Sequence, residues 1–173
     1  MFDTVLVAGL GLMGGSMAKT IKARTLSRVL GWNRTRATAE QALADGSIDA
    51  IATDALFREV DLVIIGLYPQ ATVDWLLENM PKMKKGCVIV DMVGVKQFMV
   101  DHLEQAALDA GVHYVGGHPM AGREFSGLDY ALPTLFDGAS MIFVPTRSSS
   151  EHILSQLEAY FMSLGFGQTV RCT

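Results

Sequence analysis

The stretch GLGLMG, at Gly9–Gly14, decides the predicted fold of this 173-residue chain. It has the spacing G-x-G-x-x-G and follows TVLVA, a short apolar run whose β-branched residues predict a buried strand. A segment with helical apolar spacing comes next. In that context Gly9 would form the tight turn, Gly11 would let a pyrophosphate approach the backbone, and Gly14 would let the helix pack on the sheet. Free amides at the start of that helix would attract the phosphates, so the stretch predicts a dinucleotide site.

The rest of the chain repeats the alternation of strand and helix. Asp61–Leu67 is apolar without alternation, as in a strand covered on both faces. RSSSE, at Arg147–Glu151, is interpreted as a turn with a serine N-cap. We therefore predict an α/β fold, a Rossmann-type doubly wound, mostly parallel sheet with helices on both faces. The strands are expected over residues 4–9, 28–32, 61–67, 87–91, 112–117, 140–145 and 168–171, and the helices over 35–44 and around Met17, Leu76, Leu103 and Leu157.

Polar or glycine-rich stretches follow several of these strands. Because the carboxyl ends of parallel strands meet at one edge of a sheet, these stretches should converge on a crevice where the strand order reverses. The residues predicted to contact a cofactor there are Gly9, Gly11, Leu12, Met13, Gly14, Asn33, Arg34, Thr35, Arg36, Leu67, Pro69, Asp91 and Gly94.

The residues after the second strand indicate which dinucleotide binds. NAD-binding versions of the motif usually place an acid there, which holds the ribose 2′-hydroxyl. This chain has Asn33, Arg34, Thr35 and Arg36 instead. An arginine can clamp a 2′-phosphate with paired hydrogen bonds, whereas a carboxylate would repel it. We therefore predict NADP in preference to NAD.

Composition excludes several classes of protein. A formal net charge of −4 leaves no basic face for nucleic acid or an anionic membrane. No apolar run reaches transmembrane length, and no cysteine spacing is typical of a metal site. Cys87 sits inside an apolar run and is expected to be a buried hydrophobe. Because the first residues also lack the features of a signal peptide, we expect a soluble, cytoplasmic protein without a metal.

A dinucleotide crevice suggests hydride transfer, which at an alcohol carbon needs a group that takes or holds the hydroxyl proton. The stretch GGHPMAGREFSG, at Gly116–Gly127, is polar and glycine-rich and is expected to form a loop after a strand. His118 is the candidate in this loop, because a histidine exchanges a proton near neutral pH. His102, His113 and His152 fall within or beside predicted helices and strands and are not candidates.

These motifs resemble the nucleotide-binding half of the prephenate and arogenate dehydrogenases of tyrosine biosynthesis. The resemblance rests on GLGLMGGS, on DMVGVK after the strand at 87–91, and above all on GGHPMAGREFSG, and it extends over essentially all 173 residues. It implies that His118 hydrogen-bonds the ring hydroxyl of the substrate as the hydride leaves, and that Glu124 lies near the substrate mouth. Oxidation then drives decarboxylation and aromatisation, which gives 4-hydroxyphenylpyruvate from prephenate or tyrosine from arogenate.

The chain departs from the family pattern in two ways. The family motif is usually D-x-x-S-V-K, and Gly94 stands in the position of the serine, so one polar contact is lost or supplied by water. Family members also continue into a helical domain that builds a homodimer and supplies an arginine for the substrate carboxylates. We therefore expect an NAD(P)-binding Rossmann domain over residues 1–168 and a stub over residues 169–173 that leads into that domain. By itself this chain should bind NADP and turn over little or no prephenate.

Some alternatives remain open at this point. The β-hydroxyacid dehydrogenases and imine reductases also carry G-L-G-x-M-G and N-R-T, although GGHPMAG does not fit their pattern. A non-catalytic NADP-binding module would accommodate Gly94. Arg123 either meets a substrate carboxylate or is solvated, and Ser126 is expected to be a turn or cap residue rather than a nucleophile. Prephenate and arogenate both remain candidate substrates.

Overall fold

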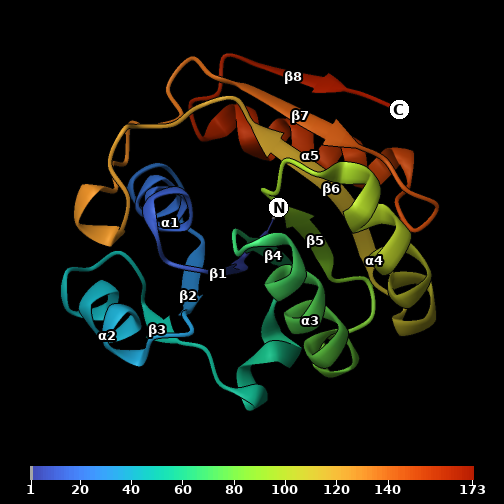
Figure 1. Ribbon diagram of the computed structural model, residues 1–173, viewed down its shortest axis with the longest axis horizontal. Helices are drawn as coiled ribbons and strands as arrows, with labels where there is room; N and C mark the ends of the chain where they lie inside the picture. Colours follow the sequence, from blue (N-terminus) through green and yellow to red (C-terminus); the bar gives the residue numbers. More distant parts are fainter. Residues whose placement is uncertain (1) are drawn as a thin grey trace.

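The computed structural model describes residues 2–173, and over these residues the chain forms one eight-stranded sheet (Figure 1). The strand order is β3-β2-β1-β4-β5-β6-β7-β8. From β1 the chain adds β2 and β3 on one side and then β4 and the later strands on the other, so the strand order reverses between β1 and β4. β6 and β7 pair antiparallel, and the other neighbours pair parallel. The strands are β1 (Thr4–Ala8), β2 (Arg28–Trp32), β3 (Ala50–Ile51), β4 (Leu62–Ile65), β5 (Val88–Asp91), β6 (His113–Pro119), β7 (Ser140–Val144) and β8 (Gln168–Arg171).

Helices cover both faces of this sheet. Within β1, Val5 and Val7 belong to a core that includes Met17, whereas Leu6 belongs to a second core that includes Leu103. Figure 1 shows α3 and α4 together on one side, with α1 and α2 across the sheet from them. The helices are α1 (Leu12–Arg24), α2 (Arg36–Ala44), α3 (Pro69–Asn79), α4 (Lys96–Ala110) and α5 (Glu151–Ser163), with short 3-10 turns η1 (Asp54–Glu59), η2 (Met80–Lys82) and η3 (Leu128–Tyr130).

The predicted α/β architecture is confirmed. β2 has the predicted bounds, and Ser150 caps α5 by accepting a hydrogen bond from the backbone nitrogen of Ile153 at 3.2 Å. Cys87 is fully buried, and burial raises the pKa of its thiol to about 12. Within residues 2–173, no helix is long and apolar enough to span a bilayer.

One prediction about the histidine loop is wrong. His118 lies inside β6 and not in a loop after it, because β7 supplies an antiparallel partner that pairs His118 with Ile142. Gly117 makes this extension possible, since a side chain there would clash with the backbone oxygen of Asp91. The glycines of this stretch therefore allow the strand to continue where a loop was expected.

Candidate functional site

The glycine loop has the geometry that a phosphate site needs. Gly9 has a φ of +89°, a conformation that other residues rarely adopt. A side chain at Gly14 would overlap the carbonyl oxygen of Gly9, so the close packing of α1 on the sheet requires glycine there. A side chain at Gly11 would meet no atom within 4 Å, so this backbone is open to a ligand. Gly11 is also the N-cap of α1 and makes no side-chain cap bond, which leaves the first amides of the helix available.

A cavity of about 520 Å³ opens over this loop. It lies at the point where the strand order reverses, and most of the residues predicted to contact the cofactor line it: Gly9, Gly11, Leu12, Met13, Gly14, Asn33, Arg34 and Leu67. The wall also contains residues that are not among the predicted cofactor contacts: Gly66, Tyr68, Ala71, Ser126 and Gly127. Ser126 and Gly127 come from the segment between β6 and β7, the end of the glycine-rich stretch that was expected to reach this crevice.

The end of β2 supplies the polar wall of this cavity. The side-chain oxygen of Asn33 accepts a hydrogen bond from the backbone nitrogen of Leu10 at 2.9 Å, and its amide donates to the carbonyl of Thr35 at 3.1 Å. Arg34 is exposed and lines the cavity. Arg36 lies outside the lining, and its guanidinium pairs with Glu40 at 3.5 Å. Arg34 is thus the one of these two arginines that lines the cavity.

Asp91, at the end of β5, is one of the residues predicted to contact the cofactor, and its carboxylate is engaged by partners inside the protein. Its carboxylate is fully buried and accepts hydrogen bonds from Tyr114 Oη at 2.5 Å and from the backbone nitrogen of Val93 at 2.8 Å, and it pairs with Lys96 Nζ. Burial raises the pKa of Asp91, against the effect of Lys96, and burial also lowers the pKa of Lys96. Asp91 therefore holds the turn after β5 against β6.

The turn after β5 places Gly94 near the side chain of His118. A Cβ at Gly94 would lie 3.7 Å from Cε1 and 4.0 Å from Nδ1 of the imidazole. The His118 ring is half-buried, and its Nδ1 is buried without a hydrogen-bond partner within residues 2–173. Gly94 and Pro69 lie outside the cavity lining. A side chain at Gly94 would therefore meet the imidazole of His118.

The segment after β6 is exposed. Glu124, the residue expected near the substrate mouth, is exposed on the surface. The guanidinium of Arg123 donates to the carbonyl of Tyr130 at 2.6 Å and lies 5.4 Å from the ring centre of Phe125. Phe125 in turn stacks on Tyr130 at 4.6 Å. Arg123 therefore links Phe125 and Tyr130 within this exposed segment.

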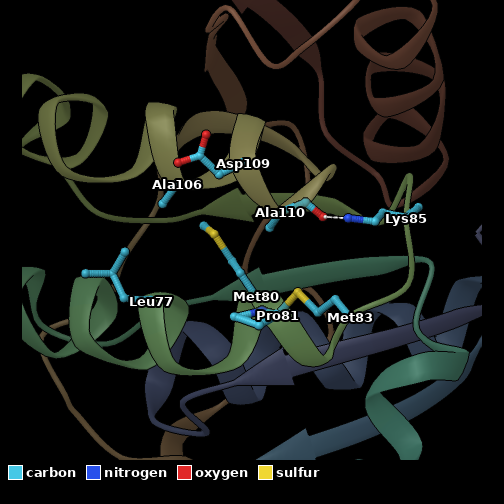
Figure 2. A pocket seen from close by; sticks show the side chains of 8 residues that line it. All are labelled: Leu77, Met80, Pro81, Met83, Lys85, Ala106, Asp109 and Ala110. Carbon is cyan, nitrogen blue, oxygen red and sulfur yellow. Dashed lines mark hydrogen bonds between the residues drawn. The ribbon is translucent and has the colours of Figure 1, made fainter.

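A second cavity, of about 420 Å³, lies between α3 and α4 (Figure 2). Its wall is mostly apolar side chains such as Met80 and Met83, and Lys85 at its rim donates to the carbonyl of Ala110 at 2.9 Å. None of the predicted site residues lines it. Across residues 2–173, no group of three histidines, cysteines or acidic residues is arranged to hold a metal ion.

A mostly parallel sheet, a glycine turn opening the first helix, and a crevice at the switch of strand order together define an NAD(P)-binding domain of the Rossmann type. The sequence profile of the family described as prephenate dehydrogenase, nucleotide-binding domain, matches residues 17–168. The chain belongs to this family. The glycine loop itself precedes the matched residues, so its assignment rests on the geometry above.

Known relatives agree with the family. The prephenate dehydrogenase of Bacillus subtilis (strain 168) is 35% identical over 162 residues, which are 91% of this chain and 43% of the relative. The arogenate dehydrogenase of Synechocystis superposes with a TM-score of 0.87 at 26% identity, over 98% of this chain and 59% of that one. A prephenate dehydrogenase from A. aeolicus in complex with hydroxyphenyl propionate and NAD+ has a TM-score of 0.89 at 24% identity, over 100% and 60%, and shares the fold. This chain therefore spans less than half of the Bacillus subtilis protein.

Proposed function

We propose that this chain supplies the dinucleotide site and the proton-handling histidine of an NADP-dependent prephenate or arogenate dehydrogenase. The observation that carries the proposal is the adjacency of the crevice and His118. Met92 donates its backbone N–H to Ile65 at 2.9 Å, next to Gly66 in the wall of the crevice. Two residues further on, a Cβ at Gly94 would lie 3.7 Å from Cε1 of His118. A cofactor in the crevice and a substrate beside His118 would thus be neighbours.

The residues of the chain fit the parts of this chemistry that they would perform. Gly11 and the first amides of α1 would hold the pyrophosphate. NADP, when bound, supplies the hydride acceptor. As the hydride leaves the ring carbon that bears the hydroxyl, His118 would hold the hydroxyl proton, and the ring carboxylate would leave as carbon dioxide while the ring becomes aromatic. Glu124, on the exposed segment after β6, would lie at the substrate mouth.

The preference for NADP is supported by Arg34. Its guanidinium is exposed at the cavity wall, and no acid takes the corresponding place at the end of β2, where Asn33 stands. The A. aeolicus protein was crystallised with NAD+. A carboxylate would favour NAD, whereas an arginine favours the additional phosphate of NADP. The homodimer and the domain boundary at residue 168 stay predictions.

A fusion protein tests the proposed reaction. Residues 1–173 are joined to the part of the Bacillus subtilis relative that lies beyond the match, since the matched region is 43% of that protein. With prephenate or arogenate and NADP, the fusion should form NADPH and the aromatic product together. A His118→Gln fusion should still bind NADP and should lose about 10²- to 10⁴-fold in turnover. Binding of NADP without turnover in the unsubstituted fusion would instead support a non-catalytic module.

A further inference from the structure

Tyr68 is an exposed aromatic residue in the wall of the glycine crevice. It is 87% exposed, although it lines the cavity together with Leu67 and Ala71. A ring that lines a cavity and is covered so little by its own chain offers an aromatic face to a ligand. The crevice therefore holds an aromatic surface that the fold itself does not bury.

The backbone holds Tyr68 at this place while its ring stays uncovered. Tyr68 is the N-cap of α3, but its side chain makes no cap hydrogen bond. Its backbone carbonyl accepts a hydrogen bond from the backbone nitrogen of Thr72 at 2.8 Å. Pro69 follows and restricts Tyr68 to an extended conformation, which its φ of −61° and ψ of 155° show. The ring can thus turn about its side-chain bonds from a fixed point at the crevice.

The lining of the cavity indicates which half of a dinucleotide Tyr68 faces. Tyr68 shares this lining with Arg34, whereas His118 lies outside it. In the proposed function, Arg34 meets the 2′-phosphate and the nicotinamide extends to His118. The 2′-phosphate and the adenine are carried by the same ribose, so the base lies in the part of the crevice that Arg34 lines. Tyr68 therefore faces the adenosine half.

We propose that the ring of Tyr68 stacks on the adenine of the bound dinucleotide and holds the adenosine half in the crevice. The inference rests on the proposed function in that a dinucleotide must bind here. Every base has a π-face, and stacking on an aromatic side chain strengthens the binding of a nucleotide. Ala71 lies one turn further along α3, and its small side chain leaves room beside the ring. Because NADP and NAD share the adenine, Tyr68 strengthens the binding of both.

Three substitutions separate the aromatic face from other properties of the residue. Tyr68→Phe keeps the face and removes the hydroxyl, and Tyr68→Leu keeps an apolar side chain without the face. Leu77→Ala is the matched control, because Leu77 is an exposed apolar residue of the same helix outside the crevice lining. Since Tyr68 is exposed and caps nothing with its side chain, both Tyr68 variants should keep the melting temperature of the unsubstituted protein.

The first measurement is calorimetric titration with NADP, with NAD and with adenosine 2′,5′-bisphosphate, which lacks the nicotinamide half. Tyr68→Leu should raise all three dissociation constants by about tenfold. Tyr68→Phe and Leu77→Ala should each change them by less than about threefold. The second measurement is a nuclear Overhauser effect between the adenine protons of bound NADP and the ring protons of Tyr68, which Tyr68→Leu should abolish.

Three results would overturn the proposal while the dinucleotide site stands. One is a Tyr68→Leu variant that binds all three ligands as tightly as the unsubstituted protein. Another is a loss of affinity confined to NADP and NAD, because Tyr68 would then contact the nicotinamide half. The third is the absence of the Overhauser effect in unsubstituted protein that binds NADP. Failure of the unsubstituted protein to bind any dinucleotide would instead contradict the crevice assignment, and the inference would fall with it.

Discussion

Asn33 and Leu10 are joined by a hydrogen bond of 2.9 Å, from the backbone nitrogen of Leu10 to the side-chain oxygen of Asn33. The bond ties the end of β2 to the glycine loop at the end of β1. The other side of the Asn33 amide donates to the carbonyl of Thr35 at 3.1 Å. One side chain thereby fixes the relative position of the loop that would hold the pyrophosphate and of Arg34, which would hold the 2′-phosphate.

Removing this bond should weaken dinucleotide binding without favouring one dinucleotide. Asn33→Ala leaves the Leu10 amide without its partner and loosens the loop, at a cost of about 1 kcal/mol. The dissociation constants of NADP and NAD should both rise by roughly fivefold to tenfold. Calorimetric titration of the variant with each dinucleotide measures both constants.

Asn33→Asp is the matched control. The aspartate keeps an acceptor for Leu10 but adds a negative charge beside the 2′-phosphate position. NADP binding should fall by about tenfold or more while NAD binding holds or improves. Equal losses for NADP and NAD in this variant would show that the 2′-phosphate does not lie next to Asn33.

Alanine substitutions at two glycines of the loop should have different effects, one on NADP affinity and the other on the melting temperature. A methyl group at Gly11 meets no atom within 4 Å, so Gly11→Ala should keep the melting temperature and lose most NADP affinity. A methyl group at Gly14 would overlap the Gly9 carbonyl, so Gly14→Ala should lower the melting temperature by about 5 °C or more. Thermal unfolding and titration of both variants check this pair. Full NADP affinity in folded Gly11→Ala would remove Gly11 from the site.

Arg34 and Arg36 should contribute unequally to the choice of dinucleotide. Arg34 lines the cavity, whereas Arg36 lies outside the lining and pairs with Glu40. Loss of a charge-assisted contact costs about 1.5–3 kcal/mol, so Arg34→Ala should weaken NADP binding by roughly 10- to 100-fold and leave NAD binding unchanged. Arg36→Ala serves as the matched control and should change either constant by less than about threefold. A larger effect from Arg36→Ala would mean that Arg36 is the phosphate ligand.

Acid should destabilise the fold partly through Asp61, at the start of β4. Burial by itself would raise the pKa of this carboxyl, but hydrogen bonds from Lys84 and from the backbone of Thr4 and Asp3 hold the pKa below its ordinary value of 3.8. Since the pKa is lower in the folded state, the carboxylate stabilises the fold above about pH 4, and this contribution is lost as the pH falls through the folded pKa.

Asp61→Asn should therefore be less stable than the unsubstituted protein at pH 7, and the difference in the free energy of unfolding should shrink between about pH 4 and pH 2. Urea unfolding at a series of pH values measures this difference. A difference that stays constant over the whole series would show that Asp61 does not act through its charge.

The sequence predicts most strands of this fold, with two exceptions that have physical reasons. Buried parallel strands such as β1, β2 and β4 are apolar runs that end in glycine or polar residues, so their positions are visible in the sequence. β3, Ala50–Ile51, is too short to show a pattern. The extension of β6 to Pro119 depends on pairing with β7, about twenty residues further along the chain, which no local pattern reveals.

The same distinction holds for the candidate site. Gly9, Gly11 and Gly14 could be predicted because their roles follow from local spacing. The glycine-rich stretch after β6 was expected to reach the same crevice, but the sequence does not show which of its residues line the wall, which are Ser126 and Gly127. The interior role of Asp91 could not be predicted either, because its partner Tyr114 lies on a different strand.

The most direct test of this account is calorimetric titration of the 173-residue chain with NADP and, separately, with NAD. The account predicts one site for each dinucleotide and at least about tenfold tighter binding of NADP, because Arg34 meets the 2′-phosphate. Tighter binding of NAD would contradict the proposed role of Arg34. Absence of binding by either dinucleotide would contradict the assignment of the glycine crevice itself.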